Sequence, residues 1–289
     1  MRRLTVAATQ MSCGWDRQAN LDRAEQLVRE AAGQGAKVIL LQELFETPYF
    51  CADEKSSYFG LATATKENAA VGRFAGIARE LGVVLPISFF ERGENSYFNS
   101  LAMIDADGRV LTVYRKSHIP QAPGYQEKFY FTPGDSGIRV IDTAYGRIGA
   151  AVCWDQWFPE CARLLALQGA ELLLYPTAIG SEPSNDDYDS RDHWRRCMQG
   201  HAAANMVPVI ASNRIGREKN ESCEMHFYGS SFITDQFGGL LAEADRETSG
   251  VITASVDLDG IKEQRASWGL FRDRRTDLYG GLLSHHGQA

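Results

Sequence analysis

Stretches of helical periodicity that lead into apolar runs organise the chain. Residues 24–43 read AEQLVREAAGQGAKVILLQE, which predicts an amphipathic helix, a glycine stop and a buried strand. Residues 162–176, ARLLALQGAELLLYP, repeat this pattern, and both copies carry Gln-Gly-Ala at the junction. Further helical stretches at about 67–81 and 190–205 lead into GVVLPISFF and VPVIAS, which predict two more strands.

Each half of the chain also predicts a β-hairpin. LAMIDADGRVLTVYRK has an Asp-Gly turn at 107–108, and SFITDQFGGLLAEA has a Gly-Gly turn at 238–239. The first strands of the two halves, TVAATQ and IGAAVC, correspond as well. This shared order predicts a duplicated unit. Two such units packed sheet to sheet, with helices outside, form a four-layer α-β-β-α sandwich of the α/β class, which we expect to be one domain over residues 1–289.

Composition and charge narrow the range of partners. The 289 residues are 44% hydrophobic and 23% charged, as in globular proteins with a sizeable core. No apolar stretch approaches the length of a membrane span. The net charge of −7 and the lack of long Lys/Arg blocks argue against nucleic acid and favour a cationic over an anionic small molecule.

The N-terminus and the cysteines indicate a cytoplasmic protein. The chain reaches the polar Gln10 before an apolar region develops, so no signal peptide is predicted. Six cysteines without C-x-x-C spacing argue against a disulfide scaffold and a zinc ribbon. His193 and His201 are eight positions apart, not at the spacing of a paired zinc site. No metal or nucleotide cofactor is predicted.

Three predicted strands end at residues with useful chemistry. KVILLQE ends at Glu43, VLTVYRK at Lys116 and IGAAVC at Cys153. Sites in α/β proteins gather beyond the carboxyl ends of strands. A carboxylate that takes a thiol proton, a thiolate that attacks a carbonyl and an ammonium that steadies the oxyanion would form a coherent set. Each residue also has a structural interpretation: Glu43 could cap a helix, Lys116 could lie on a solvated strand surface, and Cys153 could pack in the core.

A family resemblance favours the catalytic interpretation. LLQELFETPY, YRKSHIP, GYQEKFYFTPGD and GAAVCWDQWFPE closely resemble the nitrilase superfamily of carbon–nitrogen hydrolases, and the similarity extends to WGLFRDRRTDLY near the C-terminus. The family's Glu-Lys-Cys triad falls on Glu43, Lys116 and Cys153. The resemblance also implies the duplicated sandwich fold, a second catalytic glutamate at Glu127 and an oxyanion contact from the backbone N–H of Trp154.

The loop and tail sequences imply a substrate. TAIGSEPSNDDYDSRDHWRRCMQGHAAANMVPVIASNR and SWGLFRDRRTDLYGGL resemble the branch of the superfamily that hydrolyses N-carbamoylputrescine to putrescine, carbon dioxide and ammonia, a late step in polyamine synthesis from arginine through agmatine. The alternatives are a ureido-acid amidase, whose pocket would offer arginine to a carboxylate, and a binding or redox-sensing protein on the same fold. The redox alternative requires a resolving cysteine, and Cys161 is the nearest candidate in the sequence.

A small cationic carbamoyl amine requires a carboxylate at the far end of its pocket, because a buried ammonium must be paired. The loop GSEPSNDDYDSRD carries five acidic residues, of which Glu182 is preferred because it is nearest the strand end. Tyr125 and Trp154 are predicted to form the walls. Asp189 or Ser190 is expected to cap the following helix. A homo-oligomer is expected, with the C-terminal tail, about 265–289, involved in its contacts.

Overall fold

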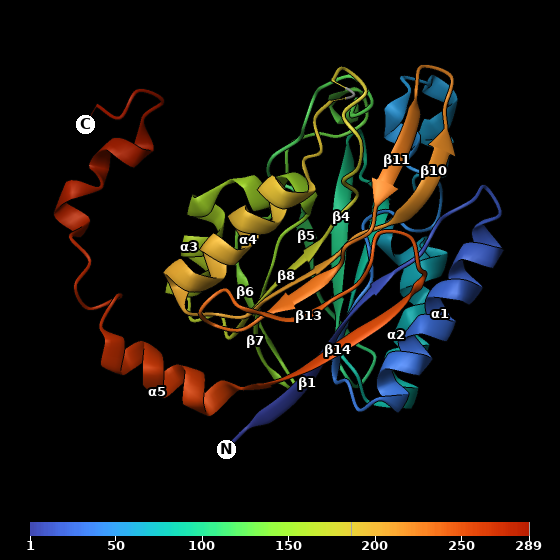
Figure 1. Ribbon diagram of the computed structural model, residues 1–289. Coiled ribbons are helices and arrows are strands. Elements are labelled where there is room, and N and C mark those ends of the chain that lie inside the picture. Colours follow the sequence, from blue (N-terminus) through green and yellow to red (C-terminus); the bar gives the residue numbers. More distant parts are fainter. Residues whose placement is uncertain (186, 289) are drawn as a thin grey trace.

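A computed structural model describes residues 1–185 and 187–288 (Figure 1). Two six-strand arrays face each other. The first has the order β14-β1-β2-β3-β4-β5, in which two three-stranded sheets are joined by backbone hydrogen bonds between Ile39 and Val84 (3.1 Å) and between Val84 and Lys37 (2.8 Å). Its strands are β1 (Arg3–Gln10), β2 (Val38–Leu40), β3 (Leu85–Arg92), β4 (Tyr97–Ile104), β5 (Val110–Arg115) and β14 (Gly250–Asp257).

The second array repeats the first. Its order is β6-β7-β8-β9-β12-β13, with the same sequence of parallel and antiparallel pairings. Its strands are β6 (Val140–Thr143), β7 (Gly146–Ala150), β8 (Leu172–Pro176), β9 (Val209–Ser212), β12 (Phe232–Thr234) and β13 (Leu240–Glu243). A separate hairpin, β10 (Ile215–Lys219) and β11 (Glu224–Tyr228), is inserted between β9 and β12. The predicted duplication is therefore confirmed.

Alternating side chains explain the layers. In β1, Val6 and Ala8 join the core between the arrays, whereas Ala7 belongs to the core under the helices of the first half. Figure 1 places α1 and α2 on one side of the molecule and α3 and α4 on the other, with the strands between. The helices are α1 (Arg17–Gly33), α2 (Ala69–Leu81), α3 (Pro159–Leu167), α4 (Arg191–Asn205) and α5 (Leu258–Trp268). The four-layer α-β-β-α sandwich is confirmed.

The Gln-Gly-Ala junctions have the same geometry in both halves. Gly35 and Gly169 each have a φ of +89°, a left-handed conformation that glycine adopts without a steric penalty. The alanine after each glycine donates its N–H to a carbonyl of the preceding helix at 3.1 Å, Ala36 to Ala31 and Ala170 to Leu165. This hydrogen bond and the left-handed glycine turn the chain from the helix into the buried strand.

Two predicted strand ends were placed too far along the chain. The strands stop at Leu40 and Ala150, three residues before Glu43 and Cys153. The backbone N–H of Val152 donates to the Asp155 carboxylate at 3.0 Å, which starts a turn instead of extending β7. Lys116 directly follows β5, as expected.

No helix within the two described ranges is both long and apolar enough to cross a membrane.

Candidate active site

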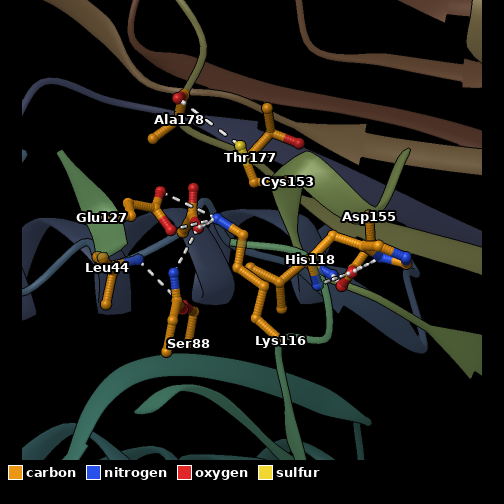
Figure 2. Close-up of polar contacts among 12 residues, drawn as sticks. Leu44, Ser88, Lys116, His118, Glu127, Cys153, Asp155, Thr177 and Ala178 are labelled. Carbon is orange, nitrogen blue, oxygen red and sulfur yellow. Dashed lines mark hydrogen bonds and ion pairs between the residues drawn. The ribbon is translucent and has the colours of Figure 1, made fainter. Parts of the chain in front are cut away.

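Lys116 lies between two glutamates in a buried cluster (Figure 2). Its Nζ is 2.9 Å from Glu43 Oε1, and 2.9 and 2.7 Å from the two carboxylate oxygens of Glu127. All three side chains are excluded from solvent. Because an ammonium group has three N–H donors, the resting cluster matches each of them with a carboxylate oxygen.

The backbone holds Lys116 from both sides. Its N–H donates to the Asn99 carbonyl, and its own carbonyl accepts the N–H of Gly134, both at 2.8 Å. A side chain at position 134 would not fit, because its Cβ would lie 2.0 Å from the Arg115 carbonyl oxygen. The lysine is therefore fixed by β4 and by the TPGD turn.

Burial and charge oppose each other in this cluster. Burial alone would lower the pKa of Lys116, but the charges of Glu127 and Glu43 hold that pKa well above its ordinary value. Burial raises the pKa of Glu127, the Lys116 charge opposes the rise, and the Glu43 charge adds to it. Two carboxylates share one ammonium here, so the cluster is suited to accept a proton.

Glu43 keeps one carboxylate oxygen free. Its Oε1 accepts hydrogen bonds from Lys116 and from Asn99 Nδ2, the latter at 2.7 Å. Its buried Oε2 has no hydrogen-bond partner among the residues that the structure describes. A buried acceptor without a donor is costly in a protein interior and is often found where a proton or ligand is to be received.

Cys153 begins a short 3₁₀ helix, Cys153–Trp157, in a strained conformation. Its φ of 44° lies in the left-handed region, which costs about 1–3 kcal/mol for a residue with a side chain. Its Sγ faces the Ala178 carbonyl at 3.8 Å (Figure 2). Burial and then the Glu43 charge raise the thiol pKa well above its ordinary value, while Lys116 opposes the rise. The resting side chain is therefore a neutral thiol that needs a proton acceptor to react.

The carboxylate of Asp155 ties the Lys116 segment to the Cys153 turn. It accepts the backbone N–H of Val152 at 3.0 Å and that of His118 at 2.9 Å. It also receives Tyr114 OH and faces His118 Nδ1, both at 2.7 Å. His118 thus contacts Asp155, in agreement with the structural role that its sequence position favours.

A cavity of about 380 Å³ opens over Cys153 and Glu127. Glu182, Tyr125 and Trp154 all line it, so the predicted substrate-binding residues share one space with the predicted nucleophile. The Tyr125 hydroxyl accepts the Gly180 N–H at 3.0 Å and donates to the Ser181 carbonyl at 3.1 Å, which fixes the loop after β8. The remaining lining residues are Pro120, Gln121, Ala122, Trp157, Ala178, Ile179, Ser184, Asn185, Tyr188, Ser190 and His193.

The acidic loop residues have different surroundings. Glu182 is half-buried, and burial raises its pKa while the Ser190 hydroxyl opposes the rise. Asp189 pairs with Arg246 and accepts the Arg191 N–H, so it caps α4 in preference to Ser190. Asp192 pairs with Arg191 and Arg195, and Asp187 is exposed. Asp186 lies outside the described residues. Within the described ranges, Glu182 is the only acidic loop residue that lines the cavity.

Sequence reasoning missed several partners of the cluster. Asn99 bonds to Glu43, Tyr49 OH donates to Glu127 Oε1 at 2.6 Å, and Asp155 links two segments. Asp155 stands in the motif around Cys153 and Tyr49 in the motif around Glu43, but Asn99 carries no local pattern that indicates a role. Cys161 is fully buried in the core, and all six cysteines are free.

Comparisons with known proteins agree with this geometry. The family model for carbon–nitrogen hydrolases matches residues 5–266. The chain belongs to the carbon–nitrogen hydrolase family. Among solved structures, a carbon–nitrogen hydrolase from Helicobacter pylori G27 superposes with a TM-score of 0.93 at 37% identity, over 98% of this chain and 99% of that one.

Two curated relatives cover almost the whole hydrolase. The N-carbamoylputrescine amidase of Arabidopsis thaliana is 54% identical over 99% of this chain and 97% of its own length. The citrullinase of Francisella tularensis is 53% identical over 98% of this chain and 99% of its own. The two relatives are thus almost equally similar to this chain.

Proposed function

We propose that this hydrolase cleaves N-carbamoylputrescine to putrescine, carbon dioxide and ammonia. The observation that carries the proposal is the cavity, which joins the buried Cys153 thiol and Glu127 carboxylate to the half-buried Glu182 across apolar and aromatic walls. A ureido group over Cys153 and an ammonium near Glu182 match the two ends of this substrate. The Arabidopsis relative, 54% identical, supports the same assignment.

In the first half-reaction, Cys153 is the nucleophile and Glu43 the general base. The free Oε2 of Glu43 takes the thiol proton as Sγ bonds to the ureido carbon. The developing oxyanion receives the Trp154 N–H, at the start of a 3₁₀ helix, and a donor from Lys116. An N–H of Lys116 is released by replacing one of its two contacts with Glu127. Ammonia leaves with the proton held by Glu43, and a substituted carbamoyl thioester remains.

In the second half-reaction, water replaces the sulfur. Glu43 removes a proton from water, which attacks the thioester carbon, and then returns the proton to the Cys153 thiolate. The released carbamic acid breaks down to putrescine and carbon dioxide. Glu127 holds Lys116 through both steps. Water is the only co-reactant that the reaction consumes.

Citrulline is the second candidate, because a relative at 53% identity is a citrullinase and Glu182 would suit its α-ammonium group. Citrulline also carries a carboxylate. No arginine or lysine lines the cavity within the described part of the chain, and His193 is its one basic lining residue. The same absence argues against N-carbamoyl-β-alanine, whose only charge is a carboxylate.

A panel of ureido compounds tests the assignment. We expect kcat/KM, measured by ammonia release, to be highest for N-carbamoylputrescine, lower for citrulline and N-butylurea, and lowest for N-carbamoyl-β-alanine. N-butylurea is the matched control, because it keeps the ureido group and the chain but lacks the ammonium. Faster hydrolysis of citrulline or N-carbamoyl-β-alanine than of N-carbamoylputrescine would overturn the proposed substrate.

We also propose that residues 1–289 fold as one domain and that the C-terminal tail joins copies of the chain. Core residues of the two halves pack into one cluster between the arrays. Leu258 and Ile261 of α5 join the core, and the chain after α5 runs along the outside of the layers (Figure 1). From Trp268 onward, the chain carries apolar side chains that are 65–94% exposed, namely Trp268, Leu278, Leu282 and Leu283. Such surface is typical of an interface.

Light scattering tests the tail. We expect a dimer or larger species at micromolar concentration, and a shift toward monomer in the variant Leu282→Ser with Leu283→Ser, which removes apolar area from the interface. The matched control changes His285 and His286 to serine in the same tail, without loss of assembly. A wild-type monomer, or an unchanged mass for the leucine variant, contradicts the proposal.

A further inference from the structure

A buried ion pair from the second half of the chain holds the segment that begins with Glu43. Arg214 follows β9, and its Nη1 is 2.7 Å from Oε1 of Glu218 on β10, with side-chain exposures of 0% and 6%. Isolated buried pairs of this kind contribute little net stability, because both charges lose their hydration. The hydrogen bonds of this pair to the backbone therefore indicate what it does.

Within the described residues, every further hydrogen bond of these two side chains is to the backbone between residues 43 and 49. Arg214 donates to the carbonyl oxygens of Glu43 at 2.9 Å, Leu44 at 3.1 Å and Thr47 at 3.3 Å. The second carboxylate oxygen of Glu218 accepts the N–H of Tyr49 at 2.5 Å. The pair thus forms hydrogen bonds with both ends of the segment 43–49.

Both ends of this segment reach the active-site cluster. Glu43 contacts Lys116, and the hydroxyl of Tyr49 donates to Glu127. Between them, Leu44 has a φ of 47°, a left-handed conformation that a leucine keeps only when its surroundings impose it. Arg214 donates to the carbonyl oxygens of Glu43 and Leu44, and Ser88 Oγ accepts the Leu44 N–H at 3.0 Å, so side chains hold the backbone on both sides of Leu44.

We propose that Arg214 and Glu218 are positioning residues that hold the Glu43 carboxylate where it can take the Cys153 proton. They touch neither the cavity nor the thiol and act through the backbone of residues 43–49. This inference rests on the catalytic roles proposed for Glu43 and Cys153. It does not depend on which ureido compound is the substrate.

The test combines turnover with alkylation of Cys153 by iodoacetamide, which needs no substrate. The variants are Arg214→Gln, Arg214→Lys and Glu218→Gln, each also built with Glu43→Gln. Arg217→Gln and Glu224→Gln are the matched controls, because that pair lies on the same hairpin, 3.3 Å apart and largely exposed. Gel filtration and circular dichroism select folded protein before each rate is measured.

We expect kcat to fall tenfold or more in Glu218→Gln and Arg214→Gln, with KM changed less than about threefold. The alkylation rate should fall toward that of Glu43→Gln, and Arg214→Lys should recover part of both losses. In the Glu43→Gln background, the Arg214 and Glu218 variants should cause no further fall in kcat or in the alkylation rate. A residue that acts through another is non-additive with it. The controls should match wild type.

Two results would overturn the proposal. One is an unchanged alkylation rate and kcat in folded Glu218→Gln and Arg214→Gln. The other is an equal loss with and without Glu43, which would mean a structural role alone. If the wild type does not hydrolyse N-carbamoylputrescine, the proposed substrate is refuted. The alkylation test would still stand, because it needs no substrate.

Discussion

Replacing Cys153 by alanine is expected to abolish turnover, with kcat falling on the order of 10⁴-fold or more. The alanine side chain cannot form the thioester, and the remaining groups only bind and polarise the ureido carbonyl. Glu43→Gln and Lys116→Ala should be nearly as damaging, because Lys116 and Glu43 are hydrogen-bonded to each other and the charges of both act on the Cys153 thiol. Ammonia release from N-carbamoylputrescine measures all three.

Cys161→Ala is the matched control for the thiol, since Cys161 is buried in the core eight residues further along the chain. It should keep wild-type kcat in folded protein. Ordinary turnover in Cys153→Ala would end the thioester mechanism. A carbamoyl adduct found by mass spectrometry on another cysteine would move the nucleophile to that residue.

Replacing Glu182 by glutamine is expected to weaken the use of the cationic substrate selectively. The carboxylate is half-buried, so loss of one charge partner should cost about 2 kcal/mol, or about 30-fold in kcat/KM for N-carbamoylputrescine. N-butylurea should lose little, because it brings no ammonium. Asp187→Asn is the matched control, since Asp187 is exposed on the same loop.

The same carboxylate predicts a pH effect. Burial raises the pKa of Glu182 above its ordinary value, so the charged form is lost as pH falls through that raised pKa. The preference for N-carbamoylputrescine over N-butylurea should therefore shrink at acidic pH in wild type and not in Glu182→Gln. An equal effect of Glu182→Gln on both substrates would mean that another group binds the ammonium.

The layered fold could be predicted from the sequence because it depends on local patterns. Helical periodicity, apolar strand runs and Gln-Gly-Ala junctions occur in both halves, and each has a geometric meaning within a few residues. The hairpin β10–β11 was not foreseen, although it continues the β9–β12 pairing in the same register, as Ala211↔Phe232 and Ile215↔Tyr228 show. The ends of β2 and β7 were also misplaced, because the apolar pattern continues past both strands, and after β7 the hydrogen bond from the Val152 N–H to Asp155 begins a turn.

The sequence by itself determined the repeat, the family resemblance and the predicted catalytic residues Glu43, Lys116, Glu127 and Cys153, since motifs of adjacent residues carry these. Only the tertiary structure decided which groups surround them. Asn99 and Arg214 contact Glu43 across 56 and 171 positions of the chain, and Tyr49 contacts Glu127 across 78, so no periodicity or spacing predicts these contacts. Their contacts follow from packing two arrays face to face, which brings the second half's Arg214 onto the first half's Glu43 segment.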